Sequence, residues 1–263
     1  MNEKRALVTG ASSGIGRVFA KELAKENYVV TGVARNEDKL KAIFRELGEE
    51  HHYVVADLTN SNQLTKIEKE LSETKYDQLI NNAGYVAYEY FENVTLERHE
   101  NVMYLNMNAL VRLSYAFLKN ATDGDALINV SSALSRLSYP GGAVYCGTKG
   151  FVTCFTESLW YEYKDKGVYV MALLPGVTLT NFHRVAFRGD PDKLPNRMAY
   201  PPEVVVSEAM KVLKERKHPS FLSGPRFRYL TAIVNRLLSR KKMIEIMGKN
   251  NPILQDEARI KMP

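Results

Sequence analysis

Cysteine is scarce in this chain, which has 263 residues and only two cysteines, Cys146 and Cys154. Two cysteines cannot build a disulfide framework, and their spacing is not that of a zinc site. None of the five histidines stands beside cysteines or carboxylates at the spacing of metal ligands. We therefore expect surface or loop histidines and no metal site. The histidines are His51, His52, His99, His183 and His218.

Long apolar runs are also missing. No uninterrupted stretch is long enough to span a bilayer, and "MNEKRALVTG" passes straight into a strand pattern without the regions of a signal peptide. These features predict a cytoplasmic protein. A net charge of +6 could suit nucleic acid or anionic membranes. Because the sequence carries no nucleic-acid-binding signature, we expect no nucleic-acid partner.

What the chain does have is a regular alternation of short apolar stretches and helical patterns. Strands are predicted at 5–10, 28–34, 52–58, 76–84, 125–132 and 168–176. Helices are predicted at 14–26, 36–47, 60–73, 95–120 and 143–164, with Asn36 and Gly48 as caps of the second. This order predicts right-handed crossovers, and therefore an α/β fold: a doubly wound parallel sheet of the Rossmann type with helices on both faces.

Residues 1–250 fit one such domain. Within it, residues 179–200 mix aromatics with glycine and prolines without a clear strand pattern, and we expect a lid over the substrate site. Residues 225–248 are basic and amphipathic, which predicts a C-terminal helix. That helix could lie on an anionic membrane, cover the active site or contact a partner subunit, and we do not favour the membrane. Residues 251–263 are expected to be a tail.

Three glycines follow the first predicted strand, in the motif "TGASSGIG". Gly10 permits a tight turn, Gly14 lets the backbone approach a pyrophosphate, and Gly16 lets the helix pack close to the sheet. The helix N-terminus then offers free N–H groups to phosphates, and Ser12 and Ser13 could add hydroxyl donors. A glycine-rich turn alone is weak evidence, but this position between strand and helix predicts dinucleotide binding.

The second predicted strand ends at Ala34 and Arg35, in "VARNEDKL", with no carboxylate at its tip. An acidic residue there would hold a ribose 2′-hydroxyl and favour NAD, whereas Arg35 can pair with a 2′-phosphate. We therefore predict NADP(H), with Asp57 placed to touch the adenine. Because Ser13 is not basic, this preference rests on Arg35 alone. The alternative is that Arg35 is a solvated loop arginine.

Tyr145 and Lys149 stand four residues apart in "YCGTK", so a helix would place them on one face. An ammonium near a tyrosine stabilises the phenolate and lowers the tyrosine pKa. The tyrosine could then give a proton to a carbonyl oxygen or take one from an alcohol. Ser132 ends the fifth predicted strand, where its hydroxyl could hydrogen-bond the same oxygen. Such a tyrosine–lysine pair on its own is common and often structural.

With "NNAG", the segment around Asn106, "NVSS" and "PGVTLT", these motifs resemble those of the short-chain dehydrogenase/reductase family. They extend over residues 9–180 in the order and spacing of that family. The resemblance implies hydride transfer between a nicotinamide and a small-molecule carbonyl or alcohol, and a homodimer or homotetramer. A cofactor-binding redox sensor without turnover is the alternative, against which the complete set of catalytic residues argues.

The resemblance also implies a role for each matched catalytic position. Tyr145 is the general acid or base, and Lys149 lowers its pKa and holds the nicotinamide ribose. Ser132 polarises the substrate carbonyl, because Tyr145 follows it by thirteen positions, the usual separation in the family. Asn106 supports a proton relay through water to Lys149, with Asn108 as a rival.

The residues predicted to bind the cofactor lie at the strand ends and at the start of the first helix. They are Gly10, Ser12, Ser13, Gly14, Ile15, Gly16, Arg35, Asp57, Leu58, Asn82, Ala83, Gly84, Tyr145, Lys149, Pro175, Gly176, Val177, Thr178 and Thr180. The residues predicted to bind the substrate are Ser132, Leu134, Tyr139, Tyr145 and Phe182. The aromatic character of the lid segment suggests an apolar substrate such as a steroid, bile acid, long-chain ketone or acyl compound.

Overall fold

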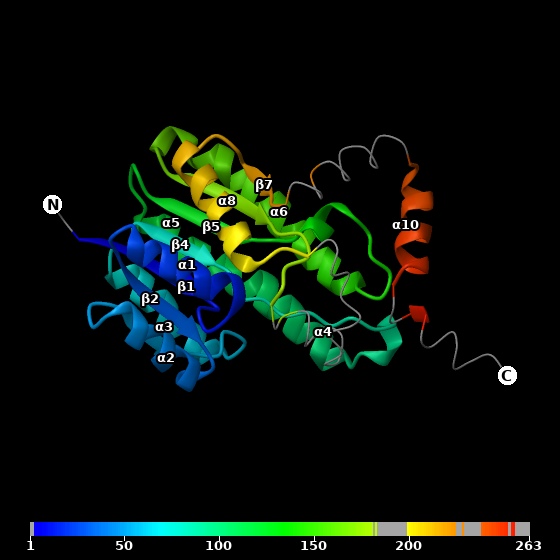
Figure 1. Cartoon of the computed structure of the whole chain (residues 1–263), viewed down its shortest axis with the longest axis horizontal. Coiled ribbons are helices and arrows are strands. Elements are labelled where there is room, and N and C mark those ends of the chain that lie inside the picture. The colour runs from blue at the N-terminus through cyan, green and yellow to red at the C-terminus, as the bar shows by residue number, and fades with distance from the viewer. Residues whose placement is uncertain are drawn as a thin grey trace.

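A parallel sheet forms the centre of the molecule, and helices cover both of its faces (Figure 1). The computed structural model describes residues 3–180, 182, 199–224, 228, 238–251 and 254–255. The seven strands of the sheet run in the order β3-β2-β1-β4-β5-β6-β7. They are β1 (Lys4–Thr9), β2 (Tyr28–Ala34), β3 (His52–Val55), β4 (Gln78–Asn81), β5 (Ala126–Val130), β6 (Tyr169–Leu174) and β7 (Ser220–Leu222). The predicted doubly wound α/β fold is confirmed.

The helices occupy the intervals between the strands. They are α1 (Gly14–Lys25), α2 (Glu37–Leu47), α3 (Ser61–Glu73), α4 (Leu96–Met103), α5 (Leu110–Asn120), α6 (Ala143–Tyr163), α8 (Pro202–Glu215) and α10 (Arg240–Lys249). Short helical turns add η1 (Phe91–Asn93), η3 (Ala133–Arg136) and η4 (Lys164–Lys166). The predicted caps of α2 are confirmed: Asn36 accepts the Lys39 N–H at 2.9 Å, and Gly48 ends the helix with φ at 122°. The sequence analysis missed α8 and β7.

The sheet is buried on both faces, as its continuous apolar strands require. Successive residues of β1 face opposite sides, so Ala6 and Val8 pack in one cluster and Leu7 packs in the other. The first cluster is closed by α1 and α8, and the second by α3 and α5. Two apolar layers therefore hold the strand ends in fixed positions, which is the condition for a preorganised site at their carboxyl edge.

The long helix predicted at 95–120 is continuous but not uniform. Between α4 and α5, a π-helical segment, η2, spans Tyr104–Ala109. Such a segment widens one turn of a helix and is frequent at functional sites. Asn106 lies in it and is almost fully buried.

The C-terminal part differs from its prediction as one helix over 225–248. Ser239 is extended, with φ at −63° and ψ at 151°, and its hydroxyl accepts the Lys242 N–H, so α10 begins only at Arg240. Residues 225–227 and 229–237 lie outside the described residues. In Figure 1, α10 lies at the end of the molecule opposite the N-terminus. The first residue of the predicted tail, Asn251, is fully buried and donates to the Pro140 carbonyl at 2.7 Å.

The predicted lid is described only at its two ends, because residues 181 and 183–198 lie outside the described residues. Thr178 and Tyr200 form an isolated parallel bridge. The Leu179 N–H donates to the Tyr200 carbonyl and the Tyr200 N–H to the Val177 carbonyl, both at 2.9 Å. These bonds bring the ends of the 179–200 segment together beside the carboxyl end of β6.

Candidate active site

One cavity of about 1020 Å³ runs along the carboxyl edge of the sheet. Every residue predicted to bind the cofactor lines it except Gly16, and all five residues predicted to bind the substrate line it too. Segments far apart in sequence, from the glycine loop to α10, therefore meet at one place. Gly16 and Asn106 are the two predicted site residues that do not line the cavity.

The glycine loop leaves room only for backbone. Gly10 has φ at +69°, and a Cβ added there would lie 2.7 Å from the Asn82 amide nitrogen and 3.1 Å from Ala83 Cα. A Cβ on Gly16 would lie 2.4 Å from the Gly10 carbonyl oxygen. Gly16 thus acts from behind the cavity, by letting α1 start directly against the turn. The open N-terminus of α1 and the side-chain-free turn fit a pyrophosphate.

Thr9 explains how the glycine loop and "NNAG" are held together, a contact that the sequence analysis did not find. Its hydroxyl oxygen accepts the N–H groups of Asn82 and Ala83, both at 3.0 Å. The Asn82 side chain donates back to the Thr9 carbonyl at 2.9 Å. These bonds fix the exits of β1 and β4 to each other, on either side of the cavity.

At the far end of the cavity, the end of β2 presents two cations rather than one. Arg35 lies 3.9 Å from the Asp57 carboxylate, and its side chain is 68% exposed. Lys39 also lines the cavity, one turn into α2, and makes no ion pair with the residues that the structure describes. Lys39 is thus a second cation at this end of the cavity, which the sequence analysis did not name beside Arg35. The sequence feature that could have predicted Lys39 is its position four residues after Arg35, across the start of α2.

Tyr145, Ser132 and Lys149 meet at the other end of the cavity, where β5 and α6 adjoin. The Tyr145 side chain is buried, and its interaction with the Ser132 hydroxyl lowers its pKa. The Lys149 ammonium lies 5.8 Å from the centre of the Tyr145 ring and donates to the Val130 carbonyl at 2.8 Å. The neighbouring Ser131 is bound to the Lys149 carbonyl at 2.8 Å, which leaves Ser132 as the serine beside the tyrosine.

The protonation of this group differs from the sequence expectation. Burial raises the pKa of Tyr145 above its ordinary value, and the interaction with Ser132 opposes this only in part. Burial also lowers the pKa of Lys149 to about 8. The expected lowering of the tyrosine pKa is not seen, because the loss of water on burial dominates the shift. Tyr145 is therefore a protonated acid at neutral pH.

Asn106 lies behind the cavity wall and shapes it. Its side-chain amide donates to the Tyr85 carbonyl at 2.9 Å and to the Thr148 hydroxyl at 3.0 Å, and its oxygen accepts the Tyr85 N–H at 2.9 Å. It thereby ties the segment after β4 to α6. Asn108 is exposed, so Asn106 is the asparagine that belongs to the site. The predicted water relay to Lys149 stays a prediction.

The substrate end of the cavity is aromatic. The ring of Tyr88 meets Tyr145 edge-on, with ring centres 5.8 Å apart, and meets Tyr139 at 5.5 Å. Phe182 lies 5.9 Å from Tyr145, while Leu134 and Val86 pack against the same cluster. The sequence analysis did not predict Tyr88 or Val86; the only signal was the apolar stretch directly after "NNAG". Further walls come from Leu238, Met243, Ile246, Met247 and Asn250 at the end of the chain.

The structure corrects the expectation for two histidines, since His51 and His99 are buried. His51 accepts the Val30 N–H at 3.1 Å, and His99 lies 3.0 Å from the Phe91 carbonyl oxygen. The described residues contain no group of three or more histidine, cysteine or acidic side chains that could hold a metal ion. Among the helices of the described part, none has the length and apolar character needed to cross a bilayer.

The geometry agrees with the comparison to known proteins. The family model described as short chain dehydrogenase matches residues 4–190. The chain belongs to the short-chain dehydrogenase/reductase family.

The individual relatives share fewer than half of their residues with this chain in the aligned regions. The very-long-chain 3-oxoacyl-CoA reductase of Rattus norvegicus is 32% identical over 192 residues, which cover 68% of this chain and 61% of the relative. The Bos taurus protein of the same name is 32% identical over 227 residues, covering 79% and 68%. The chain thus spans about three-fifths of the length of the rat relative.

Solved structures cover more of the chain. A short-chain dehydrogenase from Sphingobium yanoikuyae, in complex with NADPH, is 29% identical with a TM-score of 0.76 and covers 89% of this chain and 94% of its own. A bulky-bulky ketone specific alcohol dehydrogenase from Comamonas testosteroni is 26% identical with a TM-score of 0.74 and covers 90% and 94%.

Proposed function

We propose that the protein is an NADP(H)-dependent carbonyl reductase or alcohol dehydrogenase that acts on apolar substrates. The observation that carries this proposal is the shared cavity, which joins two cations, the glycine loop and the Ser132–Tyr145 pair. A nicotinamide, when bound, supplies or accepts the hydride. All other steps belong to side chains of this chain.

Tyr145 holds the proton in this proposal. Its raised pKa keeps the hydroxyl protonated at neutral pH, so it can give the proton to a substrate oxygen as that oxygen gains negative charge. The Ser132 hydroxyl, which lines the cavity beside Tyr145, can hydrogen-bond the same oxygen. Lys149 places a positive charge beside the ring, which favours the tyrosinate left after proton transfer. The surrounding aromatic walls exclude water from the reacting oxygen.

Arg35 and Lys39 support the choice of NADP(H) over NAD(H). Both line the cavity at the end of β2, where a 2′-phosphate would lie, and guanidinium and ammonium groups bind phosphate by charge-assisted hydrogen bonds. Asp57 accepts the Thr59 N–H at 2.9 Å and the Thr59 hydroxyl at 2.7 Å through one carboxylate oxygen, and its other oxygen lies 3.9 Å from Arg35. The NADPH complex of the similar Sphingobium protein agrees with this choice.

Cofactor affinity tests this part of the proposal. Arg35→Ala and Lys39→Ala should each weaken NADPH binding about tenfold, because each removes a charged hydrogen bond. NADH binding should change little. The double variant should therefore show the smallest difference in affinity between NADPH and NADH. Lys41→Ala is the matched control, since Lys41 pairs with Glu37 at 2.8 Å and does not line the cavity. Equal losses for NADPH and NADH in titrations of cofactor fluorescence would refute the role.

The aromatic wall supports an apolar substrate. The rings of Tyr88, Tyr139 and Phe182 pack around Tyr145 and give this end of the cavity an aromatic wall. The names of the rat and bovine relatives place 3-oxoacyl thioesters beside ketosteroids, bile acids and long-chain ketones as candidates. Consumption of NADPH across these four classes identifies the substrate. A regulator without turnover would bind NADPH and consume none with any of them.

We also infer a homodimer or homotetramer. The outer faces of α5 and α6 carry exposed aromatic side chains, Tyr115 at 69%, Phe151 at 40% and Tyr161 at 64% exposure. Contact between such faces would remove this apolar surface from water. Sedimentation equilibrium measures the assembly, and a monomer at micromolar concentration contradicts it. A cytoplasmic location stays a proposal, to be tested by cell fractionation.

A further inference from the structure

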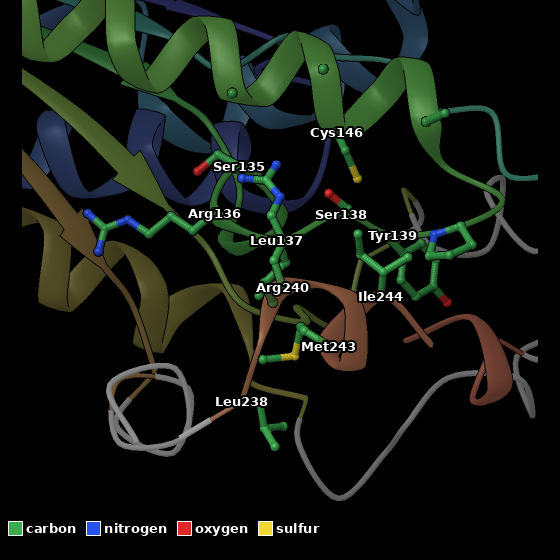
Figure 2. Close-up of a pocket in the computed structure, with 14 residues that line it drawn as sticks. Ser135, Arg136, Leu137, Ser138, Tyr139, Cys146, Leu238, Arg240, Met243 and Ile244 are labelled. Atoms are coloured by element: carbon green, nitrogen blue, oxygen red, sulfur yellow. The ribbon is translucent and has the colours of Figure 1, made fainter. Parts of the chain in front are cut away.

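A second cavity of about 710 Å³ lies beside the active site, between α6, α10 and the segment that follows β5 (Figure 2). It shares four wall residues with the first cavity, and it contacts α6 on the turn that carries Tyr145. The shared residues are Leu137, Tyr139, Leu238 and Met243. Figure 2 shows the Cys146 sulfur pointing from α6 into this space. The cavity plays no part in the function proposed above.

Among the described residues, the cavity contains a positive charge without an acidic partner. Arg136 is engaged at its edge, because its guanidinium donates to the Ser220 hydroxyl at 3.0 Å and lies 3.9 Å from the Glu157 carboxylate. Arg240 reaches from α10 across the cavity toward α6 (Figure 2) and makes no ion pair with any described residue. None of the described residues that line the cavity is acidic. Arg240 is exposed at the open side of the cavity, and a guanidinium without an acidic partner among the described residues favours an anionic ligand.

Part of the remaining wall is apolar, beside the hydroxyl groups of Ser135 and Ser138, and the wall leaves open space. Leu137, Met243 and Ile244 face the cavity on the side of α10 and the loop. On α6, a Cβ added to Gly147 would meet no atom within 4 Å, and one added to Gly150 would meet only the Ser135 carbonyl oxygen, at 3.7 Å. The volume falls within the usual range of small-molecule sites. An anionic group and an apolar chain could therefore be accommodated together.

We propose that this cavity binds a carboxylate that carries an apolar chain. The carboxylate pairs with Arg240, and the chain lies between Leu137, Met243 and the Gly147 face of α6. Because Leu137, Tyr139 and Met243 also form walls of the active site, a bound carboxylate holds α10 against the substrate end of that site. The inference concerns a site separate from hydride transfer, so it stands or falls independently of the proposed function.

Binding of octanoate to the full chain tests whether the Arg240 guanidinium pairs with a carboxylate. Octanoate is expected to bind, and Arg240→Gln is expected to weaken it about tenfold, the value of one charged hydrogen bond. Lys241→Gln is the matched control, because Lys241 is exposed on the same helix and does not line the cavity. 1-Octanol, which lacks the charge, should bind equally to the parent protein and to Arg240→Gln. Equal octanoate affinities in the two variants would overturn the proposal.

The two cysteines report where octanoate binds. Cys146 lines the cavity, whereas Cys154 is exposed on α6 outside it. Octanoate should slow alkylation of Cys146 by iodoacetamide and leave Cys154 unchanged, as measured by peptide mass spectrometry. Gly147→Leu should fill the cavity and abolish octanoate binding while NADPH still binds. Unprotected Cys146 at saturating octanoate, or undiminished binding to a Gly147→Leu protein that binds NADPH, would contradict the site.

Discussion

The two ends of the active-site cavity are built in different ways. The cofactor end is made of backbone: the turn at Gly10, the start of α1 and the strand exits, joined by the bonds between Thr9 and Asn82. The substrate end is made of side chains from η3, from the segment after β4 and from α10. Backbone positions at the cofactor end are fixed by the sheet, whereas the substrate end depends on how separate segments pack. One end can therefore stay the same while the other changes its ligand.

Removal of the Tyr145 hydroxyl, at the substrate end, should change turnover more than any other substitution described below. Tyr145→Phe keeps the ring contacts with Tyr88 and removes the proton donor, so turnover should fall about a thousandfold. The cofactor end does not use the hydroxyl, and NADPH affinity should stay within about twofold of the parent protein. Steady-state rates and fluorescence titration measure the two quantities. A variant that retains a tenth of the parent turnover would exclude Tyr145 as the acid.

Lys149 lines the cavity, and its lowered pKa should make the unfolding free energy of the protein depend on pH. Its pKa is about 8 in the folded protein and 10.5 when unfolded, so between these values the unfolded chain binds more protons. Stability should therefore rise with pH through this window, by up to about 3 kcal/mol between pH 8 and pH 10. The raised pKa of Tyr145 opposes the rise only above pH 10.

Lys149→Met should abolish that rise. Urea unfolding at several pH values, compared between the parent protein and the variant, isolates the contribution of this one group. A parallel pH dependence in the two proteins would show that Lys149 is not buried as an ammonium that loses its proton.

Close backbone contact at the cofactor end gives a third prediction. Gly16→Ala places a Cβ 2.4 Å from the Gly10 carbonyl oxygen. It should lower the unfolding free energy by about 2 kcal/mol and also weaken NADPH binding. Gly147→Ala is the matched helical substitution, since nothing lies within 4 Å of its Cβ, and should be neutral or stabilising by up to about 1 kcal/mol. Equal unfolding midpoints in urea for the two variants would contradict the close backbone contact at Gly16.

The smallest effect is expected on α10. Ile246 lines the substrate end and is 39% exposed, so Ile246→Ala should raise the KM of an apolar substrate about threefold with little loss of stability. Glu245→Ala is the control, because Glu245 is exposed and does not line the cavity. NADPH affinity should not change in either variant. A changed NADPH affinity would mean that α10 acts on the cofactor end as well.

The same division explains what the sequence could predict. Strand periodicity and the turn residues specify the cofactor end locally, so its residues could be assigned from motifs with errors of only a few residues at element ends. Lys39 was missed although the cap of its helix, Asn36, was predicted, because only the folded structure shows which residues of α2 line the cavity.

Substrate-end residues depend on long-range packing that no local pattern encodes. Tyr88 joins the site only because it packs between Tyr139 and Tyr145, and α10 does so only because its chain returns across the cavity. The break at Ser239 was hidden by an amphipathic pattern that continued through it. The tyrosine pKa was expected in the wrong direction because burial, which dominates it, cannot be read from spacing.

Transfer of isotope from cofactor to product tests hydride transfer most directly. The enzyme would be incubated with an accepted ketone and with NADPH deuterated on one or the other face of C4, and the alcohol analysed by mass spectrometry. Deuterium should appear on the carbinol carbon from one face only, and Tyr145→Phe should form almost none of this alcohol. Binding of NADPH without isotope transfer to any ketone or thioester would contradict the assignment and favour a protein that senses the cofactor.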